Sequence, residues 1–166
     1  MLALSNVPAV QSQQKQRERP VAVVSEQLAS SLQGYSTYRI SIEFAADHVQ
    51  DVYALYGEAG SPLTVPPARQ VAPPFGPDVG PTDPALFAVR PEAEFDSFLT
   101  IGIDGPALAQ GALTSVGLDL STWTETQGFQ SENAAVFFMD PDHGATTEPV
   151  VFLQLTVRTG TTFRGQ

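Results

Sequence analysis

The residues best suited to chemistry are few and scattered in this chain of 166 residues. His48 and His143 are its only histidines, and each lies in a polar stretch typical of a turn. Glu94 and Asp96 stand two residues apart, so in an extended strand their carboxylates would be about 7 Å apart. That spacing suits the acid pair of a glycoside hydrolase, but a solvated strand face explains it equally well. We therefore expect no catalytic residues, and a hydrolase using Glu94 or Asp96 is the last of three functions that the sequence leaves open.

The segment DPDHG at 140–144 is the best candidate for a metal site. Hard oxygen ligands for Ca²⁺ would come from Asp140, Asp142 and Glu148, and Gly144 would allow a tight turn. The spacing departs from that of an EF-hand loop, and Asp-Pro-Asp-x-Gly is also an ordinary hairpin turn. No other cofactor is expected, because the chain lacks cysteine and has no phosphate-binding glycine motif.

Aromatic side chains suggest a second kind of binding. A platform for stacking sugar rings would use Trp123, Tyr53 and Tyr56, although the aromatic residues of a β-sandwich belong more often to its core. Together with the candidate Ca²⁺ turn, these residues support one alternative function. In that alternative the chain is a carbohydrate-binding or adhesion module, stabilised by Ca²⁺, of a secreted protein with several domains.

The distribution of charge narrows the choice of partners. The first 20 residues hold three of the eight basic residues and one of the 18 acidic ones, which leaves a net charge of −12 on residues 21–166. A body this acidic repels nucleic acids and anionic membrane surfaces. No run of about 18 apolar residues predicts a membrane span. The first ten residues also lack the basic start of a signal peptide.

Alternating apolar and polar residues predict strands along most of the chain. The clearest strand is YRISIEF at 38–44. Further strands are expected at 51–58, 61–65, 94–104, 115–123, 134–140 and 150–157. Turns rich in Gly, Pro and Asp separate these segments and helical crossovers are lacking, so we expect an all-β fold, an antiparallel β-sandwich of jelly-roll type. Because 94–104 is apolar on both faces, it should lie centrally.

An arm and a long loop accompany these strands. Residues 1–34 form a polar arm, in which 21–34 is predicted as a short amphipathic helix, with a strand at 21–24 as the alternative. Residues 35–166 then form the sandwich. Prolines exclude a central strand from 62–84. A proline-rich loop of this kind is stiff and loses little entropy on docking, so it suits contact with another molecule.

Six stretches of the body carry a family likeness. They are TYRISIEFA, VYALYGEAGSPLTV, PFGPDVGPTDPALFAVRPEAEFDSFLTIG, SVGLDLSTW, VFFMDPD and VVFLQLTVRTGTTFRGQ. On these stretches residues 35–166 resemble a β domain of large marine bacterial proteins and of marine algal proteins, among them the shell proteins that encase the pyrenoid of diatoms. The most specific part is the loop that enters EFDSFLTIG, although Asp83-Pro84 and Phe98 stand where the family has Asn-Pro and Trp.

The resemblance implies a structural protein without active-site residues. Proteins of such shells pack side by side into a sheet around condensed carbon-fixing enzyme, which would place this chain in the chloroplast pyrenoid, whereas the carbohydrate-binding alternative would place it outside the cell. The likeness also implies that the chain, ending at FRGQ, is a fragment or one half of a tandem. Our leading hypothesis is therefore a self-assembling β-sandwich that forms homo-oligomers or sheets. Its assembly contacts would come from edge strands, from the arm and from loop residues Phe75, Pro84, Leu86 and Phe87.

Overall fold

The computed structural model describes residues 21–44, 51–105, 112–140, 142, 144–146 and 149–164. Within them the strands are β1 (Val21–Leu28), β2 (Tyr35–Phe44), β3 (Ala54–Gly57), β4 (Leu63–Val65), β5 (Phe98–Leu99), β6 (Leu113–Val116), β7 (Phe129–Ser131), β8 (Ala134–Phe138) and β9 (Val150–Arg158). Three short 3₁₀ helices join them: η1 (Pro84–Ala88), η2 (Pro91–Phe95) and η3 (Leu120–Thr122). In the part of the chain described, no helix has the length and apolar character needed to cross a membrane.

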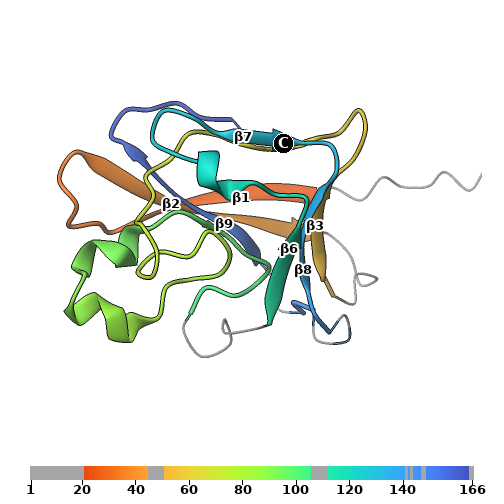
Figure 1. Ribbon diagram of the computed structural model, residues 1–166, viewed down its shortest axis with the longest axis horizontal. Coiled ribbons are helices and arrows are strands. Elements are labelled where there is room, and N and C mark those ends of the chain that lie inside the picture. The colour runs from red at the N-terminus through yellow and green to blue at the C-terminus, as the bar shows by residue number, and fades with distance from the viewer. Residues whose placement is uncertain are drawn as a thin grey trace, which may run out of the picture.

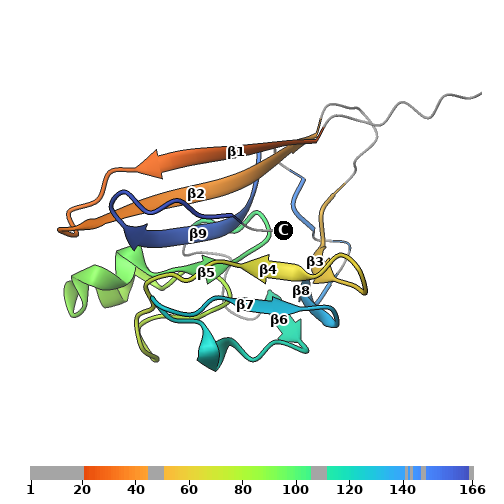
Figure 2. The same ribbon diagram turned by 90° about the horizontal axis from the view of Figure 1, so that it is seen from above.

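The strands form two facing layers. One layer is a four-stranded sheet in the order β1-β2-β9-β5, and the other consists of two smaller sheets, β3-β8-β6 and β4-β7. All of these strand pairs are antiparallel. Figure 1 labels most of the strands, and Figure 2, which also labels β4 and β5, shows β1, β2 and β9 on one side of the molecule with β3, β6, β7 and β8 on the other. The predicted all-β antiparallel sandwich is confirmed, with its second layer divided in two.

The core lies between the layers and is built on β2 and β9. Their register sets Tyr38 opposite Leu155 and Ile40 opposite Leu153, so the alternating apolar side chains of both strands share one face. The buried core residues are Ile40, Val65, Ala68, Leu99, Ile101, Ile103, Trp123, Val136, Phe138, Val150, Leu153, Leu155 and Val157. The strands predicted at 38–44 and 150–157 are thus confirmed, because their apolar period of two matches this buried face.

The other face of β9 is also buried, but it is polar. The side-chain amide of Gln154 donates to the carbonyl oxygens of Glu94, at 3.0 Å, and Asp96, at 2.8 Å. The backbone N–H of Thr156 donates to the hydroxyl of Ser97 at 2.9 Å. Buried polar groups need such partners, since an unpaired one costs about 1–3 kcal/mol. These bonds therefore fasten the segment after η2 onto the sheet.

The prediction of a helix at 21–34 is wrong, and the alternative, a strand beginning at residue 21, is confirmed. Residues 21–28 form β1 and pair with β2 in an unbroken antiparallel register from Val21–Phe44 to Leu28–Thr37. The four-residue spacing of Val24, Leu28 and Leu32 fits a strand as well as a helix, because four is also a multiple of two. The turn into β2 ends at Gly34, whose φ of 79° favours glycine.

The prediction of a central strand over 94–104 is also wrong. Only Phe98 and Leu99 pair as a strand, and β5 lies at one end of its sheet. Pro91 opens η2, so the chain is coiled up to Phe95 and then wraps across β9. Residues from Phe95 to Ile101 are nevertheless all buried. The apolar character on both faces therefore reflects burial on all sides, not a place inside the sheet.

Candidate functional site

The described part of the candidate metal segment forms a turn. The backbone N–H of Asp142 donates to Oδ1 of Asp140 at 3.1 Å, as expected where an aspartate caps a turn. The predicted ligand Glu148 lies outside the described residues, as do the two histidines, His48 and His143. Among the residues that the structure does describe, no group of three acidic or histidine side chains could hold a metal ion.

Trp123, one of the three residues of the predicted sugar-stacking platform, is buried in the core. Trp123 is only 2% exposed, its Nε1–H donates to the carbonyl oxygen of Pro66 at 2.9 Å, and its ring meets Phe129 edge to face. A ring enclosed in this way offers no face to a sugar. The prediction that Trp123 stacks on a sugar is therefore wrong, and its ring belongs to the core. Tyr53 and Tyr56 are 51% and 61% exposed, and they remain open to contact at β3.

The prediction that Glu94 and Asp96 share a solvated strand face is wrong. Glu94 is exposed in η2, whereas Asp96 is completely buried. Oδ1 of Asp96 accepts the backbone N–H of Val71 at 2.7 Å, and its Oδ2 has no hydrogen-bond partner. Burial is the main cause that raises the pKa of Asp96 to about 7. A carboxyl group without access to solvent cannot meet a substrate, so the pair is not a hydrolytic site.

The long loop is tied internally and to the sheet. Asp83 caps η1 by accepting the N–H of Ala85 at 2.9 Å, and the hydroxyl of Thr82 donates to the carbonyl of Phe75 at 3.1 Å. The N–H of Leu99 donates to the carbonyl of Asp78 at 2.9 Å, which anchors the loop beside β5. Of the four predicted contact residues, Pro84 is exposed and the other three are half-buried: Phe75, Leu86 and Phe87. The two turns η1 and η2 form a lobe at one side of the molecule (Figure 1).

One long edge of the main sheet is open. β1 is the first strand in the order β1-β2-β9-β5, so among the described residues only β2 pairs with it. Its side chains from Ala22 to Gln27 are exposed on both faces, including Val23 at 67% and Val24 at 36%. Figure 2 shows why: β1 runs along the rim of the molecule, away from the second layer. β1 thus presents a strand edge and two uncovered faces.

A groove crosses the molecule between the C-terminal segment and the segment after β4. It consists of two adjoining pockets of about 280 Å³ and 480 Å³, which share the residues Pro66, Pro67, Thr162 and Phe163. The hydrogen bond from the N–H of Ala68 to the carbonyl of Thr124, at 2.9 Å, and that from Arg69 to Thr156, at 2.8 Å, fix one wall. The groove is therefore built from segments held by backbone bonds.

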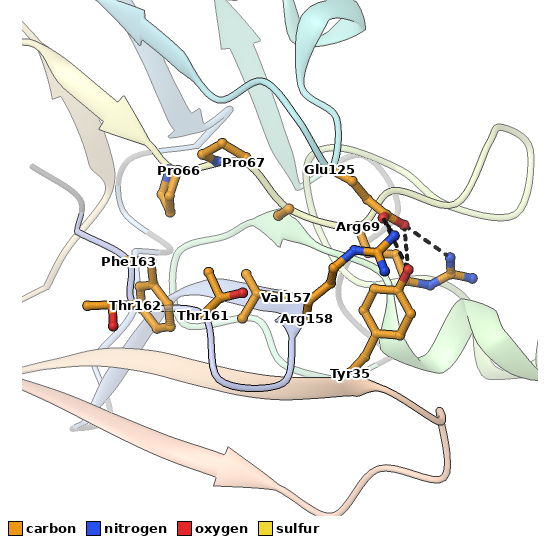
Figure 3. A pocket seen from close by; sticks show the side chains of 11 residues that line it. Tyr35, Pro66, Pro67, Arg69, Glu125, Val157, Arg158, Thr161, Thr162 and Phe163 are labelled. Atoms are coloured by element: carbon orange, nitrogen blue, oxygen red, sulfur yellow. Dashed lines mark hydrogen bonds and ion pairs between the residues drawn. The ribbon is translucent and has the colours of Figure 1, made fainter.

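A cluster of charged and aromatic side chains closes one end of this groove (Figure 3). The Tyr35 hydroxyl donates to Glu125 at 2.9 Å, and Nη2 of Arg158 contacts the same carboxylate at 3.2 Å. Nη1 of Arg69 lies 3.9 Å from it. Both guanidinium carbons also lie over the Tyr35 ring, at 5.5 Å for Arg69 and 5.6 Å for Arg158. Sequence reasoning missed this cluster, because its members come from four separate segments with no local pattern.

Comparisons of this chain with protein-family models, curated proteins and solved structures found no match.

Proposed function

We propose that this chain is a non-catalytic structural protein that associates with copies of itself through β1. The shell-forming domains that residues 35–166 resemble support the same role. The observation that carries the proposal is the open edge of β1, eight residues long and exposed from Ala22 to Gln27.

Soluble proteins usually protect such edges. The common devices are short edge strands, proline, lysine or a β-bulge, each of which prevents another strand from pairing. β1 has none of these: its sequence VAVVSEQL contains neither proline nor lysine, and its register with β2 is unbroken. Glu26 is its only charged residue. An edge with these properties suits the addition of a strand from a second molecule.

The sequence of β1 is compatible with pairing to itself. Two copies of β1 related by a two-fold axis pair in antiparallel orientation. Directly opposed residues are then either both odd-numbered or both even-numbered, because only every second residue of a strand turns its N–H and C=O groups toward the open edge. A pair centred on Val24 sets Glu26 opposite Ala22, and a pair centred on Ser25 sets it opposite Val24. Two Glu26 carboxylates facing each other would repel, and neither register places them opposite each other.

Pairing of this kind joins two four-stranded sheets into one continuous sheet and closes a dimer. Growth into a larger assembly takes a second contact on each molecule. The η1–η2 lobe is the surface proposed for it, with Phe75, Pro84, Leu86 and Phe87 as the contact residues. Val89 in the same lobe is 71% exposed and extends this surface.

Analytical ultracentrifugation tests the proposal with a pair of matched variants. In V24K/S25K, a lysine faces the same lysine of the second molecule in either register, at position 24 in one and at position 25 in the other. We therefore expect this variant to be a monomer where the wild-type chain is a dimer. The control is S115K/V116K, which makes the same two changes on β6, at the edge of the other sheet, where both residues are exposed. It should remain dimeric.

Two results would reject β1 as the interface. One is a wild-type chain that stays monomeric at the highest attainable concentration. The other is equal dissociation of both lysine variants, which would point to charge and not to the β1 edge. Circular dichroism of each variant shows whether the fold is retained.

A further inference from the structure

Positive charge is concentrated at the groove. Residues 21–166 contain five basic residues, and three of them line it: Arg69, Arg158 and Arg164. Glu125 is the only acidic residue among the described residues of the lining, so the groove carries a net charge of +2. With a total of −12, the rest of residues 21–166 carries −14. The groove therefore gathers most of the basic residues of this acidic body and offers a surface to an anion.

The walls of the groove combine flat apolar surfaces with polar groups. Pro66, Pro67 and Phe163 supply the apolar part, and Pro67 is exposed. Hydroxyl and amide groups come from Thr161, Thr162 and Gln130, all of which are exposed. The larger of the two pockets, at about 480 Å³, falls within the roughly 300–1,000 Å³ of ordinary ligand sites.

We propose that this groove binds an anionic glycan, a chain of sugars that carry carboxylate or sulfate groups. Proline and aromatic rings pack against the apolar C–H faces of sugars, and the threonine and glutamine groups can bond to sugar hydroxyls. Guanidinium groups hold carboxylate or sulfate oxygens through paired charge-assisted hydrogen bonds. The three kinds of group that such a ligand needs are thus present along one groove.

The same walls disfavour two other anionic polymers. An extended peptide is commonly held by backbone pairing, but Pro66 and Pro67 have no N–H to donate. Double-stranded nucleic acid carries one charge per about 1.7 Å of its axis, so it would bring more negative charge than a single glycan chain against a body whose remaining charge is −14. A single glycan chain with one charge on each sugar needs no backbone pairing and carries fewer charges per length than a nucleic-acid duplex.

The charged end of the groove is held in place before any ligand arrives. Glu125 accepts hydrogen bonds from Tyr35 and Arg158, and its carboxylate also lies near Arg69. Only Nη2 of Arg158 is used in this contact, and the Arg158 side chain is 74% exposed. Since a guanidinium has five N–H donors, most of those on Arg158 remain available to a ligand.

Isothermal titration calorimetry at low salt tests this proposal with four hexameric probes. They are hexagalacturonate, a sulfated maltohexaose, neutral maltohexaose and hexaglutamate. We expect the full chain to bind one or both of the anionic sugars and neither of the other two probes. Which anionic sugar binds more tightly tells carboxylate from sulfate as the preferred group.

A pair of charge-matched variants assigns the binding to the groove. R158Q/R164Q removes two guanidinium groups from the groove and should weaken binding by about tenfold or more. R39Q/R90Q removes the same charge elsewhere, where the arginines pair with Asp104 and Glu92, and should change binding less than about twofold.

Four results would overturn the proposal. They are no binding of either anionic sugar, equal binding of neutral maltohexaose, equal or tighter binding of hexaglutamate, and equal losses in the two double variants. The third result would identify the ligand as an acidic peptide, and the fourth would reduce the effect to overall charge.

Discussion

Asp96 should make the stability of this fold depend on pH in a direction opposite to that of most carboxylates. Its side chain is fully buried, one of its oxygens has no partner, and burial raises its pKa to about 7 from an ordinary 3.8. The backbone N–H groups of Val71 and Ser97 lower the pKa, and the nearby charge of Asp78 raises it, but burial is the largest effect.

The sign of the dependence follows from where the proton is bound. Between about pH 4 and pH 7 the folded chain keeps a proton on Asp96 that the unfolded chain has lost. The stabilisation from this group is therefore complete below the unfolded pKa and is lost as pH rises towards the folded pKa. One pKa unit corresponds to about 1.36 kcal/mol, so a shift of roughly three units gives an effect on the order of 4 kcal/mol.

The substitution Asp96→Asn removes this dependence while keeping the shape of the side chain. Urea unfolding of both proteins at intervals from pH 4 to pH 8 gives the free energy of unfolding of each. The stability of the variant relative to the wild-type chain should rise with pH up to about 7 and then level off. A difference that stays constant over this range would refute the reasoning, and one that falls with pH would mean that Asp96 is stabilised as a carboxylate.

Two further predictions concern the packing around this loop. In Gly76→Ala the new Cβ would clash with Oδ2 of Asp96 and with the carbonyl oxygen of Val71. This variant should lower the free energy of unfolding by about 1–3 kcal/mol, measured by urea unfolding. The control Gly105→Ala, where the new Cβ would meet open space, should change it little. Gln154→Leu leaves the carbonyl oxygens of Glu94 and Asp96, of which the second is buried, without their amide donor, and it should lower the unfolding free energy by about 1–3 kcal/mol; an unchanged midpoint would show that water replaces the amide.

The parts of the fold that could be predicted from the sequence are those where one pattern has one structural meaning. In β2 and β9, apolar side chains alternate because one face of each strand meets the core, and both strands lie where the alternation places them. The long loop could also be predicted, since proline cannot donate in a ladder. What proline could not indicate is how the loop returns to the sheet.

The wrong predictions share a physical cause: the deciding contacts are distant in sequence. In residues 94–97 the backbone is held by the side chain of Gln154 and by a bond between Thr156 and Ser97, which take the place of a neighbouring strand. Alternation alone cannot distinguish this arrangement from a central strand. Trp123 is a similar case, because the bond to Pro66 that buries its polar end joins residues 57 positions apart.

The groove could not be predicted, although its charges are visible in the sequence. Arg69 is far in sequence from Arg158 and Arg164, so the sequence gives no sign that these three basic residues form one group. The fold brings Arg69 beside the end of β9 and so gathers them. The buried carboxyl of Asp96 was hidden in the same way. Its neighbours Glu94 and Ser97 gave the segment a polar appearance, whereas the packing around Gly76 and Val71 decides its environment.

The two proposed surfaces use different interactions, and the response to salt separates them. Pairing through β1 depends on backbone hydrogen bonds and valine side chains, and it brings together two bodies that each carry a charge of −10. Salt screens that repulsion, so it should favour the dimer. Binding at the groove depends on attraction between arginine and an anion, and salt should weaken it. If instead both respond in the same direction, a single electrostatic contact accounts for the two activities, and the separation of an assembly edge from a ligand groove fails.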